Sequence, residues 1–418
     1  MNVSDYIRDL GTKARAAAAA FVRFDTAAKN TALLAIADRL EADKAAIDAA
    51  NARDVENARA AGLSPAMVDR LTLTDARFKS MVDGVRHVAS LPDPVGETIW
   101  QRTRPSGISI RKVRVPFGVV AVVFESRPNV FVDTAALCLK TGNAIILRGG
   151  KEAILSNKAL ADAVSAALVD AGAPSAAVQF VDILDHAAVA ELVRAVGLVD
   201  LAIPRGGERL IRAMCEAALI PVLKHYKGVC HVYVDDRADL AMALAILDNA
   251  KVQRPSACNA AECLLVHEKV APLFLPMVRA WAKDKGVRLN EELRVESEAT
   301  GAQGADRIEW DREFLALEMN VGVVADCRAA IAHVNAHGSH HSDCIVTNDA
   351  ARAAEFLRDV DSATVYHNAS TRFTDGAEFG MGAEIGISTD KLHARGPMGL
   401  EELTTYKYLI TGDGAIRA

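Results

Sequence analysis

Short apolar segments alternate with helix-like segments over most of the chain, and this alternation restricts the fold more than any other feature. The first series begins with GVVAVVF at 118–124 and continues through AIIL, AVQFV and VDLAI. A second series begins with CHVYVD at 230–235 and continues through ECLLVH, NVGVVAD, SDCIVTN and ATVYHN. Repeated strand–helix units of this kind form parallel sheets that are covered by helices on both faces. The sequence therefore predicts an α/β protein, and its 418 residues are enough for two or three domains.

The remaining segments predict helices before the first series and an antiparallel hairpin. Residues 4 to about 92 indicate consecutive amphipathic helices, because apolar residues recur at intervals of three and four, and Gly62 fits the end of one helix. The runs ETIWQRTRP and ISIRKVRVP are separated by Ser-Gly and predict a β-hairpin with Arg and Lys on one face. The tail TYKYLITGDG predicts a last strand.

Charge and hydropathy exclude several classes of function. The 48 Lys and Arg against 54 Asp and Glu leave no global basic field for nucleic acid or an anionic membrane. The longest apolar runs, such as AAAAAFV at 16–22, are too short to span a bilayer. The first residues carry acidic side chains early and lack a cleavable hydrophobic segment, so we expect no export signal. The seven cysteines include no C-x-x-C pair, which fits a reducing compartment. We therefore expect a cytoplasmic metabolic enzyme with neither a nucleic-acid nor a membrane partner.

Cys258 is the candidate nucleophile. It lies in QRPSACNAAECLLV, in a turn of small and polar residues before a buried strand, with Arg254 close by in sequence. A nearby cation and backbone N–H groups lower the pKa of a thiol towards neutrality. A free cysteine is more often a small buried hydrophobe, so on spacing alone both interpretations stay open. The buried interpretation applies to the cysteines inside apolar segments, namely Cys138, Cys215, Cys263, Cys327 and Cys344.

The stretch FESRPNVFVD at 124–133 ends a buried strand and begins a helix. Open α/β sheets bind ligands at the carboxyl ends of their strands, and a helix N-terminus favours anions. Asn129 could donate a hydrogen bond to a ligand there, and Arg127 could bind an anion. The alternative is that Asn129 only caps the helix.

Two further loops, LRGGKEA at 147–153 and PRGGERL at 204–210, place Arg-Gly-Gly between a strand and a helix. Glycine permits a close approach of the backbone, and the basic side chains add positive charge. Neither loop is a G-x-G-x-x-G fingerprint, but two such loops in one sheet indicate a ligand with phosphate groups. The candidate residues are Arg148, Gly149, Gly150, Lys151, Arg205, Gly206 and Gly207.

The segment HVNAHGSHHSD is a candidate metal site because it contains four histidines. His333, His337, His340 and His341 have spacings that could surround zinc. However, the first two belong to a predicted helix, and the segment contains no H-E-x-x-H motif and no nearby cysteine pair. We therefore expect histidines that line a cleft and no metal.

Taken together, these segments resemble the aldehyde dehydrogenase superfamily, in particular a branch that reduces an acyl phosphate. The matching stretches span residues 115 to 408 and are VPFGVVAVVFESRPNV, TGNAIILRGGKEA, VDLAIPRGG, GVCHVYVD, QRPSACNAAECLLV, GSHHSDCIVTND and GMGAEIGISTDKLHARGPMGLEELTTYKY. The resemblance implies two parallel-sheet α/β domains plus an oligomerisation hairpin. Its boundaries are 1–98 and 115–228 for a dinucleotide-binding domain, 229–365 for a catalytic domain, and 99–114 and 400–418 for a hairpin and tail joined across a subunit boundary.

The resemblance also implies roles for individual residues. Cys258 corresponds to the thiol nucleophile, Asn129 to the oxyanion donor, and the two Arg-Gly-Gly loops to the dinucleotide site. Relatives that oxidise aldehydes have a Glu-Leu-Gly-Gly segment with a general base, whereas HYKGVCH at 225–231 contains no carboxylate. Arg127 and Arg254 are candidates for holding the substrate phosphate.

The implied reaction is the NADPH-dependent reduction of L-glutamyl 5-phosphate to L-glutamate 5-semialdehyde and phosphate, through a thioester, in proline biosynthesis. Arg148 and Lys151 favour NADPH over NADH, because a cationic pair suits the extra phosphate. We also expect a homo-oligomer, either dimer or tetramer, and functional coupling to glutamate 5-kinase, which makes the acyl phosphate. The alternatives are a CoA-acylating aldehyde dehydrogenase with the same thiol and a non-catalytic dinucleotide-binding protein.

Overall fold

The chain forms two compact units in a computed structural model that describes residues 2–224, 226–292 and 308–417. Unit 1 consists of Met1–Lys224, Gly380–Gly386 and Met398–Ala418. Unit 2 consists of His225–Phe379 and Ile387–Pro397. The chain therefore passes from one unit to the other four times, at 224/225, 379/380, 386/387 and 397/398.

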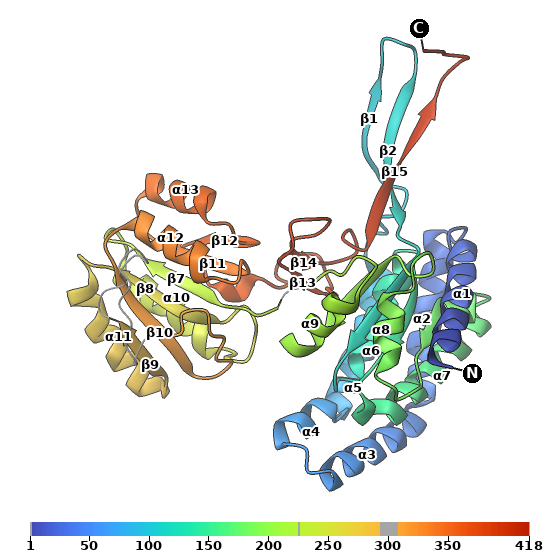
Figure 1. The fold of residues 1–418 in the computed structure, drawn as a ribbon, viewed down its shortest axis with the longest axis horizontal. Coiled ribbons are helices and arrows are strands. Elements are labelled where there is room, and N and C mark those ends of the chain that lie inside the picture. The colour runs from blue at the N-terminus through green and yellow to red at the C-terminus, as the bar shows by residue number, and fades with distance from the viewer. Residues whose placement is uncertain (1, 225, 293–307, 418) are drawn as a thin grey trace. The chain divides into compact units, whose positions relative to one another are not determined.

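Unit 1 begins with the predicted series of helices, which the structure confirms (Figure 1). Side-chain oxygens of Asn2, Asp25, Ser64 and Thr74 accept hydrogen bonds from first-turn N–H groups, so four helices begin at a polar cap. Gly62 follows the third helix with a φ of 74°, which glycine adopts without strain. The helices are α1 (Val3–Phe21), α2 (Thr26–Ala42), α3 (Lys44–Ala60), α4 (Pro65–Leu71) and α5 (Asp75–Ser90).

The first parallel sheet lies in unit 1 and has the order β5-β4-β3-β6. Its strands are β3 (Val119–Phe124), β4 (Ala144–Arg148), β5 (Val178–Phe180) and β6 (Leu201–Arg205). The helices that follow are α6 (Asn129–Lys140), α7 (Ile154–Asp170), α8 (Ala187–Val193) and α9 (Glu208–Ala217), with short 3₁₀ turns η1 (Lys151–Ala153) and η2 (Ser175–Ala177). All residues of β3 and β4 are buried. In chain order, the sheet extends from β3 through β4 to β5 on one side, and β6 then pairs with the other side of β3. The strand order therefore reverses at β3.

The predicted hairpin consists of β1 (Thr98–Thr103) and β2 (Ser109–Pro116), which pair antiparallel. The tail strand β15 (Thr404–Thr411) pairs with β2 of the same chain, from Thr404 opposite Pro116 to Thr411 opposite Ser109 (Figure 1). This pairing uses one chain only, so the tail joins the hairpin without a second subunit.

The second parallel sheet lies in unit 2 and has the order β12-β11-β7-β8-β10-β9. Helices α10 and α11 pack on one face, against Val232 and Val234, and helices α12 and α13 pack on the other, against Tyr233. The strands are β7 (Cys230–Val234), β8 (Ala261–His267), β9 (Arg288–Glu292), β10 (Glu318–Val324), β11 (Ser342–Val346) and β12 (Thr364–His367). The helices are α10 (Leu240–Val252), α11 (Ala271–Lys285), α12 (Cys327–His337) and α13 (Ala350–Asp359), and η3 (Thr371–Phe373) follows β12.

The α/β class with parallel sheets and a hairpin is confirmed, while three short strands were not predicted. Strand β9 has the polar sequence RLNEE and lies at the edge of its sheet, so it lacks the apolar run of a central strand. Strands β13 (Gly386–Ser388) and β14 (Gly396–Met398) form a two-stranded sheet and are too short to give a pattern. None of the described helices combines the length and apolar character that crossing a bilayer requires.

Candidate active site

Cys258 lies in the turn between α10 and β8, before the first residue of β8. The Ala257 N–H donates to the Arg254 carbonyl at 3.1 Å, and the Ala260 N–H donates to the Ala257 carbonyl at 3.0 Å. Cys258 is partly exposed. The prediction that Cys215 is buried is wrong, since it is partly exposed on α9. The other cysteines are buried, namely Cys138, Cys230, Cys263, Cys327 and Cys344. Cys258 thus combines exposure with a tight turn next to an arginine.

The backbone of Gly228 packs directly against the backbone of Cys258 and leaves no room for a side chain at position 228. A β-carbon at Gly228 would lie 1.7 Å from the Cys258 carbonyl oxygen, so only glycine fits there. The Cys230 thiol donates to the same carbonyl oxygen at 3.4 Å. These contacts fix the carbonyl group of the turn. Sequence reasoning had assigned no role to Gly228 or Cys230.

Asn259 connects this turn to the segment around η3 through hydrogen bonds. Its Nδ2 donates to the carbonyl of Thr374 at 2.8 Å, and its own carbonyl accepts from Thr371 Oγ1 at 2.7 Å. The guanidinium of Arg372 donates to Asn259 Oδ1 and, through Nε at 2.9 Å, to Gln253 Oε1. A segment more than a hundred residues later in the chain therefore borders the cysteine turn.

Two arginines supply positive charge beside Cys258. The pKa of Arg372 is lowered from its ordinary value, first by burial and then by the charge of Arg254, while the charge of Cys258 opposes this change. The hydrogen bonds of Arg372 go to neutral amide oxygens. Its charge therefore stays available to the thiolate and to an anionic ligand.

Asn129 is the first residue of α6 in unit 1. Its Nδ2 donates to Asp133 Oδ2 at 2.8 Å, and the N-cap residue of the helix is Pro128, with no side-chain cap hydrogen bond. Asn129 therefore does not cap the helix, and its amide is oriented by a carboxylate one turn later. Burial raises the pKa of Asp133 to about 6, although the hydrogen bond from Asn129 and the charge of Arg205 both act to lower it.

The first Arg-Gly-Gly loop follows β4. Arg148 is only 7% exposed, and its Nη1 donates to the carbonyl of Gly149 at 3.0 Å. A β-carbon at Gly149 would lie 2.1 Å from Asn157 Nδ2, so this glycine serves close packing. Lys151 is exposed. The loop thus presents the lysine rather than the buried arginine to solvent.

The second Arg-Gly-Gly loop follows β6, next to the segment after β3. The Gly207 N–H donates to Glu125 Oε2 at 3.1 Å, and a β-carbon at Gly206 would lie 2.6 Å from Glu125 Cδ. By contrast, a β-carbon at Gly207 would meet nothing within 4 Å. Arg205 is partly exposed, and the missing side chain of Gly386 leaves room for its guanidinium.

These loops fit a dinucleotide ligand. Both lie at the carboxyl edge of the unit 1 sheet, and β3 and β6 flank the point where strand succession reverses, which is where such sheets bind nucleotides. The open space at Gly207 and the exposed charge of Lys151 suit a phosphate-bearing ligand. Arg127 is also exposed, in the loop after β3.

The predicted site residues therefore fall into two groups. Asn129, Arg127 and the two Arg-Gly-Gly loops belong to unit 1, where the structure gathers them at one edge of the sheet. Cys258 and Arg254 belong to unit 2, where they share one turn.

The stretch predicted to lack a general base is held by three acidic residues from elsewhere in the chain. Lys227 Nζ forms an ion pair with Asp311 Oδ2 at 3.0 Å, and the Gly228 N–H donates to Glu313 Oε1 at 2.8 Å. His231 is buried, with Nδ1 3.0 Å from Asp343 Oδ1, and His225 lies outside the described residues. Sequence reasoning missed Glu313, which is 85 residues away from Gly228.

The four histidines considered for zinc have other partners. The His333 ring lies between Trp310 and His337, with ring centroids 4.6 Å from each, and burial lowers the pKa of His333 to about 2. His340 Nδ1 is 2.6 Å from the Asp361 carbonyl, and His341 Nδ1 is 2.8 Å from Ser342 Oγ. These rings therefore pack and hydrogen-bond rather than converge on one point.

A different group in unit 2 has donor atoms close enough for a metal. It is the only such set that the described residues contain, and it consists of Asp235, Asp236 and His267. Arg352 Nη1 pairs with Asp235 Oδ1 at 2.6 Å and with Asp236 Oδ1 at 2.5 Å. The guanidinium already supplies the positive charge that a cation would bring.

Comparison with known proteins gives consistent matches. Residues 4–300 match the model of the aldehyde dehydrogenase family. The chain is 52% identical over 417 residues to the gamma-glutamyl phosphate reductase of Moorella thermoacetica, and the match covers 100% of both chains.

Solved structures agree with the sequence matches. The gamma-glutamyl phosphate reductase of Thermotoga maritima is 42% identical, with a TM-score of 0.94 over 99% of this chain and 100% of that one. The reductase of Saccharomyces cerevisiae is 30% identical, with a TM-score of 0.55 over 99% and 98% of the chains. An acetylating aldehyde dehydrogenase from Geobacillus thermoglucosidasius, at 15% identity and a TM-score of 0.70 over 100% and 98%, shares the fold alone.

Proposed function

The chain belongs to the aldehyde dehydrogenase family, and we propose that it reduces L-glutamyl 5-phosphate to L-glutamate 5-semialdehyde and phosphate, a step of proline biosynthesis. The observation that carries this proposal is the full-length match to a gamma-glutamyl phosphate reductase. The partly exposed Cys258, in a turn bordered by two arginines, supports it.

Cys258 acts as the nucleophile. The positive charges of Arg254 and Arg372 stabilise its thiolate. The thiolate attacks the carbonyl carbon of the acyl phosphate, a C–S bond forms, and the bond from that carbon to the phosphate oxygen breaks. Phosphate leaves, and a thioester remains on Cys258.

Asn129 donates a hydrogen bond to the oxyanion that forms during this attack, and Asp133 orients its amide. A reduced nicotinamide dinucleotide held by the loops of unit 1 would supply the hydride that converts the thioester to the aldehyde. When the resulting thiohemiacetal collapses, Cys258 leaves as the thiolate and is ready for the next turnover.

The dinucleotide is held by unit 1. We assign its phosphates to Lys151 and Arg205 and to the loops that contain Gly149, Gly150, Gly206 and Gly207, with Arg148 as a buried support. Lys151 is exposed and basic, so NADPH is preferred over NADH. In the domain scheme, 1–98 and 115–228 bind the dinucleotide and 229–365 carry the nucleophile.

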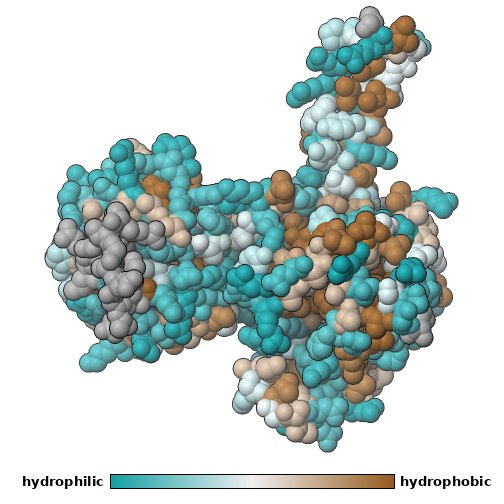
Figure 2. All heavy atoms as spheres, in the orientation of Figure 1, coloured by the Kyte–Doolittle hydropathy of each residue, from teal (hydrophilic) through white to brown (hydrophobic). Residues whose placement is uncertain are grey.

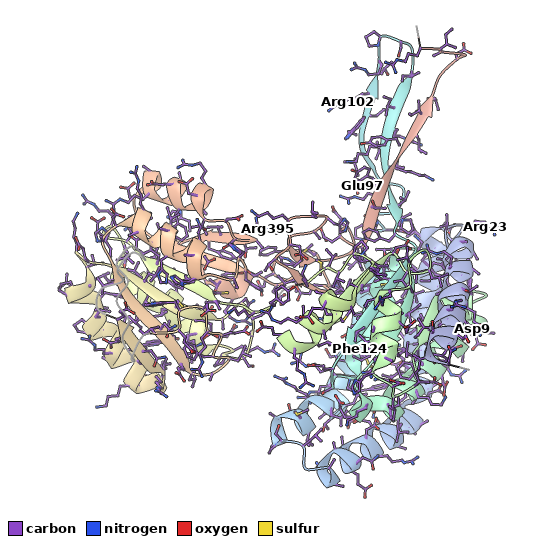
Figure 3. All side chains as sticks on the ribbon, viewed as in Figure 1. Asp9, Arg23, Glu97, Arg102, Phe124 and Arg395 are labelled. Atoms are coloured by element: carbon purple, nitrogen blue, oxygen red, sulfur yellow. The ribbon has the colours of Figure 1, made fainter. Side chains whose placement is uncertain are left out.

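The hairpin sheet is the proposed oligomerisation element of a cytoplasmic dimer or tetramer. Its exposed apolar side chains are Ile99, Tyr406, Tyr408 and Ile410, and Figure 2 shows hydrophobic residues on the surface of this hairpin sheet. Arg102, labelled on the same sheet in Figure 3, has its guanidinium carbon 4.8 Å from the centroid of the Trp100 ring. An exposed strip of this kind is typical of an interface. Functional coupling to glutamate 5-kinase is expected because the acyl phosphate is unstable.

A coupled assay tests the function. Glutamate 5-kinase, ATP and glutamate generate the acyl phosphate, and NADPH oxidation is followed with and without the kinase. We expect kinase-dependent oxidation and a higher kcat/KM with NADPH than with NADH. In the reverse direction, glutamate 5-semialdehyde should be oxidised and NADP reduced at a rate that depends on added phosphate or arsenate. Steady formation of free glutamate without phosphate would contradict the proposal, because water would then reach the thioester.

A further inference from the structure

A hollow of about 270 Å³ borders the cysteine turn within unit 2. It is lined by Asn249, Gln253, Arg372, Phe373, Asp375 and Glu378. It thus contains one guanidinium, two carboxylates, two side-chain amides and an aromatic ring. The direct link to the nucleophile is Arg372, which donates to Asn259, the residue after Cys258.

Arg372 is held in place by uncharged groups. Its Nε donates to Gln253 Oε1 at 2.9 Å and its Nη1 donates to Asn259 Oδ1. A guanidinium has five N–H donors in one plane. In the described part of the chain, Nη2 has no hydrogen-bond partner, so a pair of donors remains for a carboxylate that enters the hollow.

The two acidic residues decide which anion the hollow suits. Asp375 Oδ1 accepts from the Ala377 N–H at 2.9 Å, which fixes that carboxylate, and Glu378 is exposed. Two carboxylates next to the guanidinium repel a phosphate dianion but attract an ammonium group. The pattern of one cation and two anions is complementary to an α-amino acid, which carries a carboxylate and an ammonium on one carbon.

We propose that this hollow binds the amino-acid head of the substrate, with Arg372 on the α-carboxylate and Asp375 and Glu378 facing the α-ammonium. The proposal rests on the proposed function, since it assigns a place to the glutamyl group whose other end Cys258 attacks. Phe373 is 47% exposed, and its ring offers an apolar surface to the methylene groups between the two ends.

Substrates that lack one half of the amino-acid head test this assignment. The reverse reaction is measured with glutamate 5-semialdehyde, with 4-aminobutanal, which lacks the carboxylate, and with 5-oxopentanoate, which lacks the ammonium. Arg372→Met should lower kcat/KM for every aldehyde, because it removes charge beside the thiolate, and should lower it about 10- to 100-fold further, through KM, for glutamate 5-semialdehyde than for 4-aminobutanal. Arg328→Met, which removes an arginine that is 85% exposed on α12, should change neither value.

Glu378→Gln provides a second, independent arm. It should lower the preference for glutamate 5-semialdehyde over 5-oxopentanoate, whereas Glu268→Gln, at an exposed position in the same unit, should leave that preference unchanged. If Arg372→Met does not fold, the Glu378→Gln measurement alone tests whether the hollow binds the amino-acid head.

The outcomes separate this inference from the proposed function. If Arg372→Met and Glu378→Gln lower kcat/KM by the same factor for all three aldehydes, the assignment is overturned. A rise in KM for phosphate, equal for all aldehydes, would also overturn it, because Arg372 would then hold the phosphate. If the wild-type protein shows no phosphate-dependent oxidation of glutamate 5-semialdehyde, the proposed function itself fails.

Discussion

The backbone of Gly228 lies so close to the Cys258 carbonyl that a β-carbon would sit 1.7 Å from its oxygen. Gly228→Ala must therefore displace the nucleophile turn. We expect kcat to fall about 100-fold or more, because a shift of about 1 Å in a reacting group has this effect. Gly84→Ala is the control, since its β-carbon would meet nothing nearer than 4.0 Å. Equal kcat values for the two variants would contradict the role of this contact.

Cys258→Ala should abolish reduction while the melting temperature stays close to that of the wild type, because the thioester has no other place to form. Cys215→Ala is the matched control, since Cys215 is also partly exposed. The coupled assay and a thermal melt measure both properties. Turnover of Cys258→Ala at the wild-type rate would rule out the mechanism.

Asn129→Ala removes the proposed oxyanion donor. Loss of one such donor typically lowers kcat by about 10²- to 10³-fold. Asp133→Asn keeps an acceptor for the Asn129 amide and should have a smaller effect on kcat. An unchanged kcat in a folded Asn129→Ala protein would leave this residue with a structural role only.

His333 makes stability depend on pH. Burial lowers its pKa to about 2 in the folded state, against an ordinary value of 6.5. The unfolded chain therefore binds a proton below pH 6.5 that the folded chain does not, and stability falls as the pH falls through this window. Between pH 7 and pH 5 this amounts to about 2 kcal/mol. In denaturant unfolding, His333→Phe should lose less unfolding free energy between pH 7 and pH 5 than the wild type. An identical pH dependence of the two proteins would contradict this role of His333.

Lys251 and Glu262 form an ion pair with 2.8 Å between Nζ and Oε2, and both side chains are fully buried. Lys251→Met leaves a buried carboxylate without its partner, and we expect a loss of about 3–5 kcal/mol in unfolding free energy. The double variant Lys251→Met/Glu262→Gln should recover most of this, because the amide oxygen can still accept from the Leu315 N–H. An additive loss in the double variant would mean that the pair is not coupled.

The site features that could be predicted from the sequence are those set by neighbouring helices and strands along the chain. Strand and helix patterns predicted that Cys258 follows a helix and precedes a strand and that Asn129 begins a helix, and both positions are found. Arg372 was missed because it meets Asn259 across 113 residues, and no local pattern reports such a contact. The same applies to Glu313 and Gly228.

The interpretation of individual loop residues was less complete. The sequence presented Arg148 and Lys151 as one cationic pair, but the arginine is buried against its own loop and the lysine is exposed. Which of two neighbouring basic side chains faces solvent depends on the packing of β4, and the spacing of residues does not contain that information.

The pairing of β15 with β2 has a consequence for synthesis on the ribosome. Arg114 of β2 and Thr404 of β15 are 290 residues apart, so β2 leaves the ribosome long before its partner strand exists. Until then, β2 keeps one unpaired edge, which is a site for wrong pairing with other nascent chains. The continuous segment His225–Phe379 of unit 2 emerges in the meantime and is available to fold first. The hairpin sheet can therefore gain its third strand only after the six strands of the unit 2 sheet have been synthesised.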